Sequence, residues 1–144
     1  KTGDSNINVT EELLSKKFAE EIILQRFVTD ATNGDKRILL LNGEPLGAVL
    51  RVHPAGDHRN NFFAGGKAEP TTLTKREEEI IATLKPHLLK LGLYFVGIDV
   101  IGGYLIEVNV TSPTGLQEMK QLYNKNLEDE VTAFVESLVI RKRA

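Results

Sequence analysis

The chain has 144 residues, the length of one ordinary domain. Its hydrophobic fraction of 41% and charged fraction of 26% are typical of a globular protein, and a formal charge of −2 gives no overall attraction to nucleic acid or anionic lipid. The absence of cysteine excludes a disulfide framework, a thiolate metal site and a cysteine nucleophile.

The first half of the chain is predicted to contain one helix and three strands. Residues 10–20 have helical periodicity, and residues 21–28 (EIILQRFV) have the composition of a strand. Residues 36–41 (KRILLL) and 45–52 (PLGAVLRV) are two more strands. Asn42-Gly43 between them favours a type I′ turn, because both central residues of that turn need positive φ. We therefore expect a β-hairpin here, followed by a long loop over residues 53–70 that is either functional or mobile.

The second half is predicted to alternate helices with a second hairpin. Thr74 and Glu77 form a capping box that opens a helix running to about Leu91, where Gly92 stops it. Pro86 inside that helix predicts a kink or two shorter helices. A hairpin from residue 97, a short helix near 115–123 and a helix over about 127–141 complete the chain. The resulting class is α+β, with helices packed against a largely antiparallel sheet.

The second hairpin carries oxygen-bearing side chains where a core hairpin would carry Val or Thr. In GIDVIGGYLIEVNVTSPTG (97–115), the period of two places Glu107 and Asn109 about 7 Å apart on one face. A two-residue Gly102-Gly103 turn would direct Asp99 to the opposite face. We predict instead a three-residue loop with Gly103 as a left-handed bulge, which brings Asp99 to the face of Glu107 and Asn109.

These three side chains are candidate ligands for a hard cation. Oxygen donors without a neighbouring His or Cys suit Mg²⁺, which commonly shares its coordination with substrate phosphates. The alternative is that Glu107 and Asn109 only form the solvated face of an amphipathic strand, and the strand pattern by itself favours this alternative. Asp99 argues against it, because an acid inside so apolar a run is disfavoured unless it is paired.

Basic residues form a possible counterpart to these acids. Arg37 follows Gly34-Asp35, Arg51 closes the next strand, and further cations lie in the loop beside Gly65-Gly66. Guanidinium groups bind phosphate and carboxylate through paired donors, and glycine-rich loops let backbone N–H groups approach an anion. The alternative is a scatter of surface charges. No Ser-His-Asp order, P-loop or RNA-binding aromatic face is present.

Three segments of the sequence resemble the bacterial glutathione synthetases, a family of ATP-grasp ligases. They are GDKRILLLNGEPLGAVLR, NNFFAGGKAEPTTLT and GLYFVGIDVIGGYLIEVNVTSPTG, and the likeness extends from about Gly3 to Leu122. An Asp…Glu-x-Asn pattern is shared by many ATP-grasp enzymes, whereas the ending NVTSPT is particular to this family. The resemblance implies the large C-terminal lobe of an ATP-grasp fold.

The resemblance also implies a reaction, in which ATP phosphorylates the carboxylate of γ-glutamylcysteine and glycine attacks the acyl phosphate. It implies Mg²⁺, or Mn²⁺, at Asp99, Glu107 and Asn109, and phosphate or acyl-phosphate contacts for Arg37 and Arg51. The nucleotide contacts that it implies are the segment Gln25, Arg26, Phe27 and Val28 for adenine, and Asp35 for the ribose. The substrate contacts that it implies are Arg59, Asn61, Gly65, Gly66 and Ser112.

The chain lacks an initiating Met and opens with a polar stretch, so we expect it to be a piece of a longer protein. On the family pattern, residues 1–144 are the C-terminal part of an ATP-grasp domain, without the N-terminal substrate domain and the small ATP-grasp lobe. We expect a cytoplasmic protein that forms homo-oligomers at full length and binds neither nucleic acid nor membranes. Another ATP-grasp amino-acid or peptide ligase, and a non-catalytic module of the same fold, remain alternatives.

Overall fold

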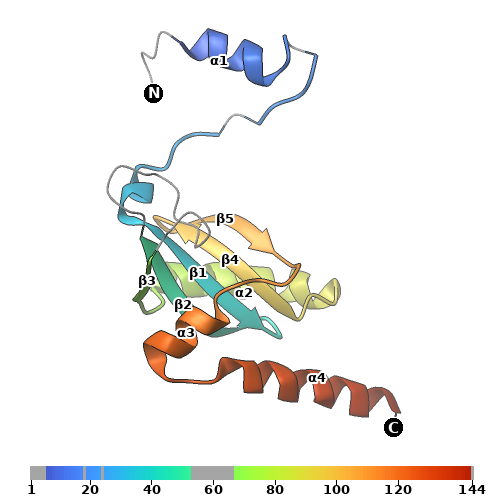
Figure 1. The fold of residues 1–144 in the computed structure, drawn as a ribbon. Helices are drawn as coiled ribbons and strands as arrows, with labels where there is room; N and C mark the ends of the chain where they lie inside the picture. The colour runs from blue at the N-terminus through green and yellow to red at the C-terminus, as the bar shows by residue number, and fades with distance from the viewer. Residues whose placement is uncertain (1–5, 18, 24, 53–66, 144) are drawn as a thin grey trace.

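The computed structural model describes residues 6–17, 19–23, 25–52 and 67–143. For residues 141–143 it describes the backbone only. The chain forms a five-stranded sheet, and helices lie around it (Figure 1). The elements in chain order are α1 (Ile7–Leu14), a 3₁₀ turn η1 (Thr29–Asn33), β1 (Asp35–Leu41), β2 (Glu44–Val52), β3 (Lys67–Pro70), α2 (Lys75–Lys90), β4 (Phe95–Ile101), β5 (Tyr104–Asn109), α3 (Leu116–Tyr123) and α4 (Leu127–Arg143).

The strands form one antiparallel sheet in the order β3-β2-β1-β4-β5. The predicted first hairpin is confirmed: Leu41 pairs with Glu44, and Asn42 and Gly43 both have positive φ, 54° and 76°. Strand β1 lies at the centre, with β2 on one side and β4 on the other. The predicted α+β class with a largely antiparallel sheet is therefore confirmed.

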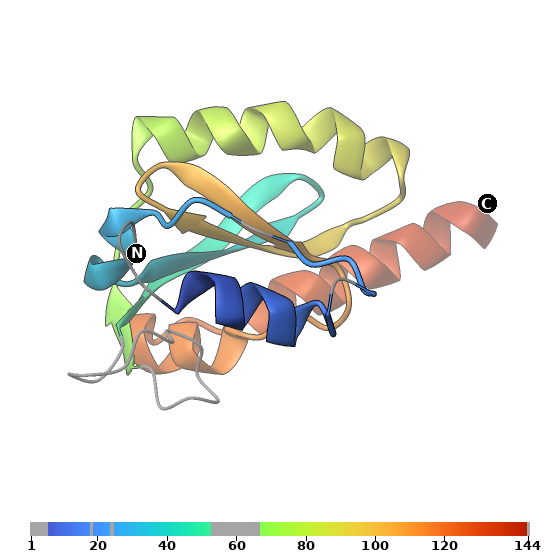
Figure 2. The same cartoon turned by 90° about the horizontal axis from the view of Figure 1, so that it is seen from above.

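Each face of the sheet has its own hydrophobic core. Seen from above, α2 covers one face while α3 and the start of α4 lie on the other (Figure 2). The α2 face includes Ile38, Leu40 and Ile98, all fully buried. The α3 face buries Leu39 and Val49 against the helical residues of a smaller second cluster. Because side chains alternate along a strand, consecutive residues of β1 serve the two cores in turn.

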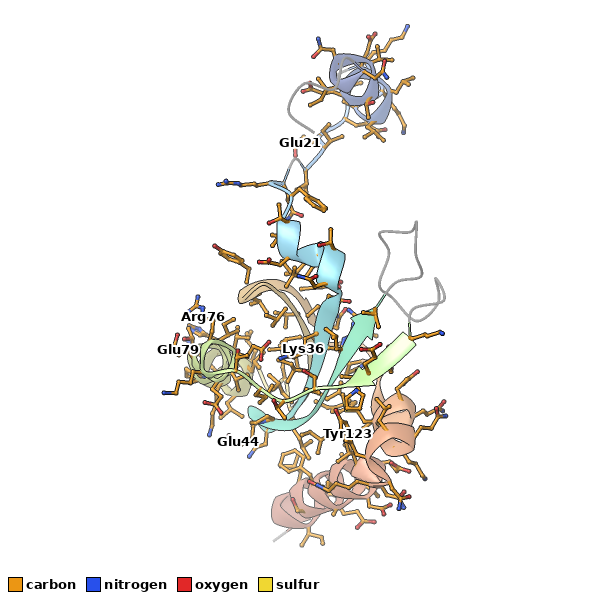
Figure 3. All side chains as sticks on the ribbon, turned by 90° about the vertical axis from the view of Figure 1, so that its left-hand side faces the viewer. Glu21, Lys36, Glu44, Arg76, Glu79 and Tyr123 are labelled. Carbon is orange, nitrogen blue, oxygen red and sulfur yellow. The ribbon has the colours of Figure 1, made fainter. Side chains whose placement is uncertain are left out.

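The start of α2 is fixed to the sheet by a network of polar contacts. Thr74 and Glu77 form the predicted capping box. The Glu77 carboxylate also accepts a hydrogen bond of 2.8 Å from Lys36 Nζ of β1, which donates a second one of 2.8 Å to the carbonyl of Thr72. Figure 3 shows Lys36 on the side of the sheet that faces α2. The helix then runs through Pro86 as one element, so the alternative of two shorter helices is wrong.

Two expectations for the secondary structure are corrected. Among residues 21–23 and 25–28 there is no strand, because no neighbouring strand in the described part of the chain pairs with this segment, and a strand needs such a partner. Conversely, the end of the predicted loop is a strand, β3, which pairs with Val49–Val52 of β2. It has no alternating pattern and contains Pro70, which an edge strand tolerates.

Helix α1 lies apart from the sheet and is joined to it by the segment before η1 (Figure 1). None of its residues is buried, and Leu13 and Leu14 are 72% and 63% exposed. Its apolar side therefore has no partner within the described residues. Within the described residues, no helix is long and apolar enough to cross a membrane.

Candidate active site

The turn of the β4–β5 hairpin differs from the prediction. Gly102 and Gly103 both have positive φ, 55° and 77°, and Ile101 pairs with Tyr104 across them. The turn is therefore the two-residue Gly-Gly type, and the predicted three-residue loop with a bulge at Gly103 is wrong. The bulge lies further along β5 instead, because Val100 pairs with Leu105 while Asp99 pairs with Glu107, which leaves Ile106 as the extra residue.

This displaced bulge brings the three candidate ligands together. Asp99 lies directly opposite Glu107, and Asn109 Nδ2 donates a hydrogen bond of 3.4 Å to Asp99 Oδ2. Asp99 is buried, Asn109 is half-buried and Glu107 is exposed. The side-chain carboxylate of Glu107 forms no hydrogen bond or ion pair with a described residue. Two carboxylates and one amide therefore meet on one face, with one carboxylate facing solvent.

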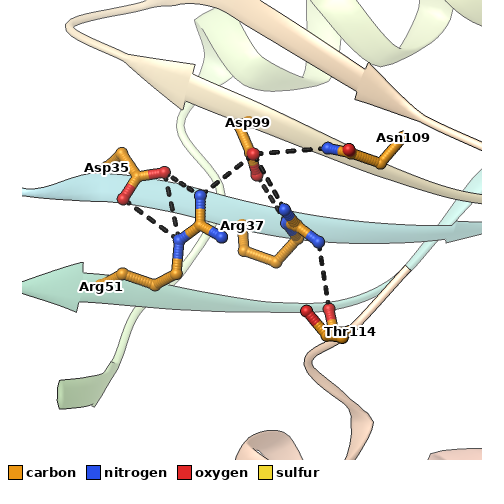
Figure 4. A network of polar contacts seen from close by, with 6 residues as sticks. All are labelled: Asp35, Arg37, Arg51, Asp99, Asn109 and Thr114. Carbon is orange, nitrogen blue, oxygen red and sulfur yellow. Dashed lines mark hydrogen bonds and ion pairs between the residues drawn. The ribbon is translucent and has the colours of Figure 1, made fainter. Parts of the chain in front are cut away.

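Asp99 is also the common acceptor of two buried arginines (Figure 4). Arg37 donates to both of its oxygens, from Nε at 2.5 Å and from Nη2 at 2.9 Å. Arg51 Nη2 lies 3.0 Å from Asp99 Oδ2, and the same guanidinium donates to both oxygens of Asp35. All four side chains have no more than 7% of their surface exposed. The Arg51 guanidinium thus links the acids of β1 and β4, while Arg37 contacts Asp99 but not Asp35.

The strand register explains why these charges meet. Arg37 pairs with Asp99 of β4, and Asp35 pairs with Arg51 of β2. Along β1, Asp35, Arg37 and Leu39 share one face, so the face that is apolar at Leu39 becomes charged toward the start of the strand. Opposite charges on neighbouring strands stabilise a sheet pairing. The charged cluster therefore lies on the same face of the sheet as the α3-side core.

Burial and charge have opposite effects on the Arg51 guanidinium. Removal from water lowers the pKa of Arg51, but its hydrogen bonds to Asp35 and the negative charges of Asp35 and Asp99 outweigh this, so the net shift is upward. Arg51 is therefore a permanent cation. The charges of Asp35, Arg37, Arg51 and Asp99 cancel, and Glu107 beside them gives the site a formal charge of −1 before any ligand binds. A divalent cation would reverse that sign and attract an anion.

The segment after β5 closes over this group. The carbonyl of Thr114 accepts a hydrogen bond of 3.2 Å from Arg37 Nη1. A Cβ at Gly97 would lie 2.8 Å from Pro113 Cβ and 3.2 Å from Arg37 Nη1, so only glycine fits beneath this segment. Ser112, predicted to contact substrate, is exposed at the same bend and has a left-handed φ of 48°. Such a conformation is uncommon for serine.

We expect Gly97→Ala to destabilise the chain by about 1–3 kcal/mol, because the added methyl group overpacks a filled site. Urea unfolding would measure the change in the free energy of unfolding. Val108→Ile adds a methyl group to the neighbouring edge strand, where the side chain is 38% exposed, and should change stability by less than about 0.5 kcal/mol. Equal effects of the two variants would contradict the close packing of Pro113 on Gly97.

A second candidate region lies where the segment before β1 meets the second hairpin. Arg26, Phe27 and Val28 line a cavity of about 490 Å³ together with Thr29, Asp30 and Tyr104. Gln25, the remaining residue of the segment expected to meet the adenine, is exposed. The sequence predicts neither Tyr104 as a site residue nor the contact of the Thr114 carbonyl with Arg37. The exposed aromatic residue beside a Gly-Gly turn could have indicated Tyr104, whereas no local signal marks the carbonyl of Thr114.

Four of the expected substrate contacts lie outside the described residues: Arg59, Asn61, Gly65 and Gly66. Asp35, expected to meet the ribose, is buried with Arg51, and its two carboxylate oxygens accept from that guanidinium. Arg37 and Arg51, both expected to meet phosphate, lie together beside the candidate metal ligands.

The donor set fits a hard divalent cation. Among the described residues, no group of three or more His, Cys, Asp or Glu side chains could hold a metal. The candidate site instead combines the carboxylates of Asp99 and Glu107 with the amide oxygen of Asn109, and amide oxygens are ordinary ligands of Ca²⁺ and Mg²⁺. Such a site is incomplete by itself and leaves positions for water or phosphate oxygens, as Mg²⁺ requires.

The five-stranded sheet and its helices have the ATP-grasp fold. The structure of a D-alanine–D-alanine ligase from Bacillus anthracis, complexed with ATP, matches 97% of this chain and 49% of that chain. The TM-score is 0.57 at 18% sequence identity, which shows a shared fold.

The chain belongs to the prokaryotic glutathione synthetase family, because the family model "Prokaryotic glutathione synthetase, ATP-grasp domain" matches residues 1–124. Glutathione synthetase from Synechocystis is 51% identical over 134 residues, which are 93% of this chain and 42% of that protein. Those from Synechococcus elongatus and Agrobacterium fabrum are 47% and 49% identical, over 95% and 82% of this chain and 42% and 37% of those proteins. The chain thus spans about two fifths of the length of these relatives.

Proposed function

We propose that this chain supplies the metal-binding and phosphate-binding part of a glutathione synthetase, which joins γ-glutamylcysteine to glycine through an acyl phosphate at the expense of ATP. The observation that carries the proposal is the pairing of Asp99 with Glu107 beside two buried arginines, in a chain that belongs to this family. The small ATP-grasp lobe and the substrate domain would come from outside residues 1–144.

The acidic residues of the site would hold the cation. Asp99, Glu107 and Asn109 would bind Mg²⁺, or Mn²⁺, which when bound neutralises charge on the phosphates during phosphoryl transfer. Glu107 is suited to this because its carboxylate is exposed and has no partner among the described residues. Asp99 would share its oxygens between the cation and the arginines that it now contacts.

The arginines would orient and stabilise the reacting anion. Arg37 and Arg51 present guanidinium groups whose planar donors match phosphate or carboxylate oxygens. Because Asp99 and Asp35 hold both groups in buried positions, little reorganisation is needed when an acyl phosphate forms beside them. The carbonyl of Thr114 fixes the remaining end of Arg37. Ser112, at the bend just before it, would lie close to the acceptor amine.

The nucleotide would extend from the 490 Å³ cavity toward the cation site. Backbone groups of Arg26 and Val28 would meet the adenine, with Gln25 and Phe27 in the same segment, and Asp35 would meet the ribose hydroxyls. Arg59, Asn61, Gly65 and Gly66 would contact γ-glutamylcysteine or glycine. We further propose that the full-length protein is cytoplasmic and homo-oligomeric, and that it binds neither nucleic acid nor membranes.

An assay of the full-length gene product tests this function. With γ-glutamylcysteine, glycine and Mg-ATP, we expect formation of glutathione, ADP and phosphate in equal amounts. Omission of Mg²⁺ should abolish turnover, and Mn²⁺ should restore it in part. Turnover of other amino-acid pairs but not of this one would replace the substrate assignment with another ATP-grasp ligase. The absence of any ATP-dependent turnover, together with ATP binding, would indicate the non-catalytic module.

A further inference from the structure

The hairpin that carries the candidate metal ligands also carries an exposed aromatic residue. Tyr104 begins β5 and lines the 490 Å³ cavity opposite the segment Arg26–Asp30. Its side chain is 62% exposed, and that of Phe27 in the same cavity is 66% exposed. Two large aromatic groups thus border one cavity without being buried, although exposed aromatic surface is unfavourable in water.

Neither of these two rings stacks on another aromatic ring within the described part of the chain. The one aromatic pair found there is Tyr94 with Phe134, whose ring centroids are 5.6 Å apart. Tyr104 and Phe27 therefore border the same cavity without stacking on each other. A cavity bordered by two aromatic rings that do not stack on each other is suited to a planar ligand, because aromatic rings favour offset or stacked contacts with other π systems.

The position of Tyr104 is fixed by contacts of the turn that precedes it. Asp30 packs so closely on Gly102 that a side chain at that glycine would collide with its carboxylate. On the other side, Arg76 Nε of α2 donates a hydrogen bond of 3.3 Å to the carbonyl of Gly103. The Gly-Gly turn is thus held between η1 and α2, and this defines where Tyr104 stands relative to the cavity.

Tyr104 and Glu107 lie on one face of the hairpin. Because of the bulge at Ile106, their partners on β4, Ile101 and Asp99, are two residues apart, which corresponds to roughly 7 Å along the strand. A planar base beside Tyr104 could therefore extend its polyphosphate along β5 toward Glu107 and Asp99. Arg26, which also lines the cavity, adds a cation near the same ligand.

We propose that Tyr104 forms an aromatic wall against which the purine base of the nucleotide stacks, opposite the segment Arg26–Val28. This inference rests on the proposed function and adds a base-binding residue to it. Stacking acts on the base and not on the phosphates. Tyr104 therefore contributes to nucleotide affinity separately from Glu107, although both residues belong to one strand.

The test compares ATP with inorganic tripolyphosphate, which has phosphates but no base. In the full-length gene product with Mg²⁺, calorimetric titration should show that Tyr104→Ala weakens ATP binding roughly tenfold. Tyr104→Phe keeps the ring and should stay within about twofold of the wild type, because the stacking area is unchanged. Val135→Ala is the control, since Val135 is 51% exposed on α4 and does not line the cavity. It should bind ATP as the wild type does.

Tripolyphosphate should bind equally to the wild type and to Tyr104→Ala. A wild-type affinity for ATP in Tyr104→Ala would overturn the inference while leaving the proposed function intact. An equal loss for ATP and tripolyphosphate would also overturn it, because the substitution would then act through the cation site. If the wild-type protein binds no ATP at all, the proposed function is wrong, and so is this inference.

Discussion

Replacing Asp99 by alanine should lower the free energy of unfolding by about 3–5 kcal/mol, because it leaves two buried guanidinium groups without their shared partner. Arg51 would retain Asp35, but Arg37 would retain only the carbonyl of Thr114 among the contacts seen here. Urea unfolding followed by circular dichroism would measure the loss.

The double variant Asp99→Ala with Arg37→Met tests whether the stability loss of Asp99→Ala comes from the unpaired charge of Arg37 or from other lost contacts. If the cost of Asp99→Ala comes from an unpaired charge at Arg37, removal of that charge should recover part of the stability. A loss below about 1 kcal/mol for Asp99→Ala would contradict the buried network. If the double variant recovers no stability, the loss in the free energy of unfolding comes from packing.

Replacing Glu107 by glutamine should instead leave stability almost unchanged and remove activity. Glu107 is exposed and has no ion-pair partner among the described residues, so we expect a stability change within about 0.5 kcal/mol. Loss of a charged metal ligand weakens stabilisation of the transition state by several kcal/mol. The kcat of the full-length gene product should therefore fall by about two to three powers of ten.

Glu136→Gln is the control for this substitution. It removes an exposed carboxylate from α4, away from the site, and should leave kcat unchanged. Full activity of Glu107→Gln would contradict the assignment of Glu107 as a metal ligand. A large loss of stability in Glu107→Gln would show that the carboxylate has a structural partner instead.

The elements with local signals could be predicted from the sequence. Asn42-Gly43 specifies its turn because both residues adopt positive φ readily, and Thr74 with Glu77 specifies the start of α2 through contacts within one helical turn. The segment 21–28 has equally strand-like residues but forms no strand. Whether a strand forms depends on a neighbour to pair with, and sequence composition does not report that neighbour.

The second hairpin shows how an expectation can be right for a wrong reason. Asp99 was expected beside Glu107 through a bulge in the turn, and it lies there through a bulge at Ile106. The glycines favour positive φ but do not fix where the extra residue is placed. That position depends on the pairing and packing of both strands, which is not local information.

The contact of Arg37 with Asp99 could not be predicted from sequence either. The two residues are 62 positions apart, and their meeting follows from β1 lying next to β4 in the sheet. In the sequence, the arginines form a candidate anion site and the acids form a separate candidate cation site. The structure unites them, so binding of the cation at Asp99 and binding of the anion at Arg37 are expected to influence each other.

The most direct test of the cation site is a titration of the full-length gene product with Mn²⁺, followed by electron paramagnetic resonance of the free ion. In the presence of ATP, the wild type should bind Mn²⁺, Glu107→Gln should bind it at least about tenfold more weakly, and Glu136→Gln should match the wild type. Equal Mn²⁺ affinity in the wild type and in Glu107→Gln would contradict the assignment of Asp99, Glu107 and Asn109 as the metal ligands.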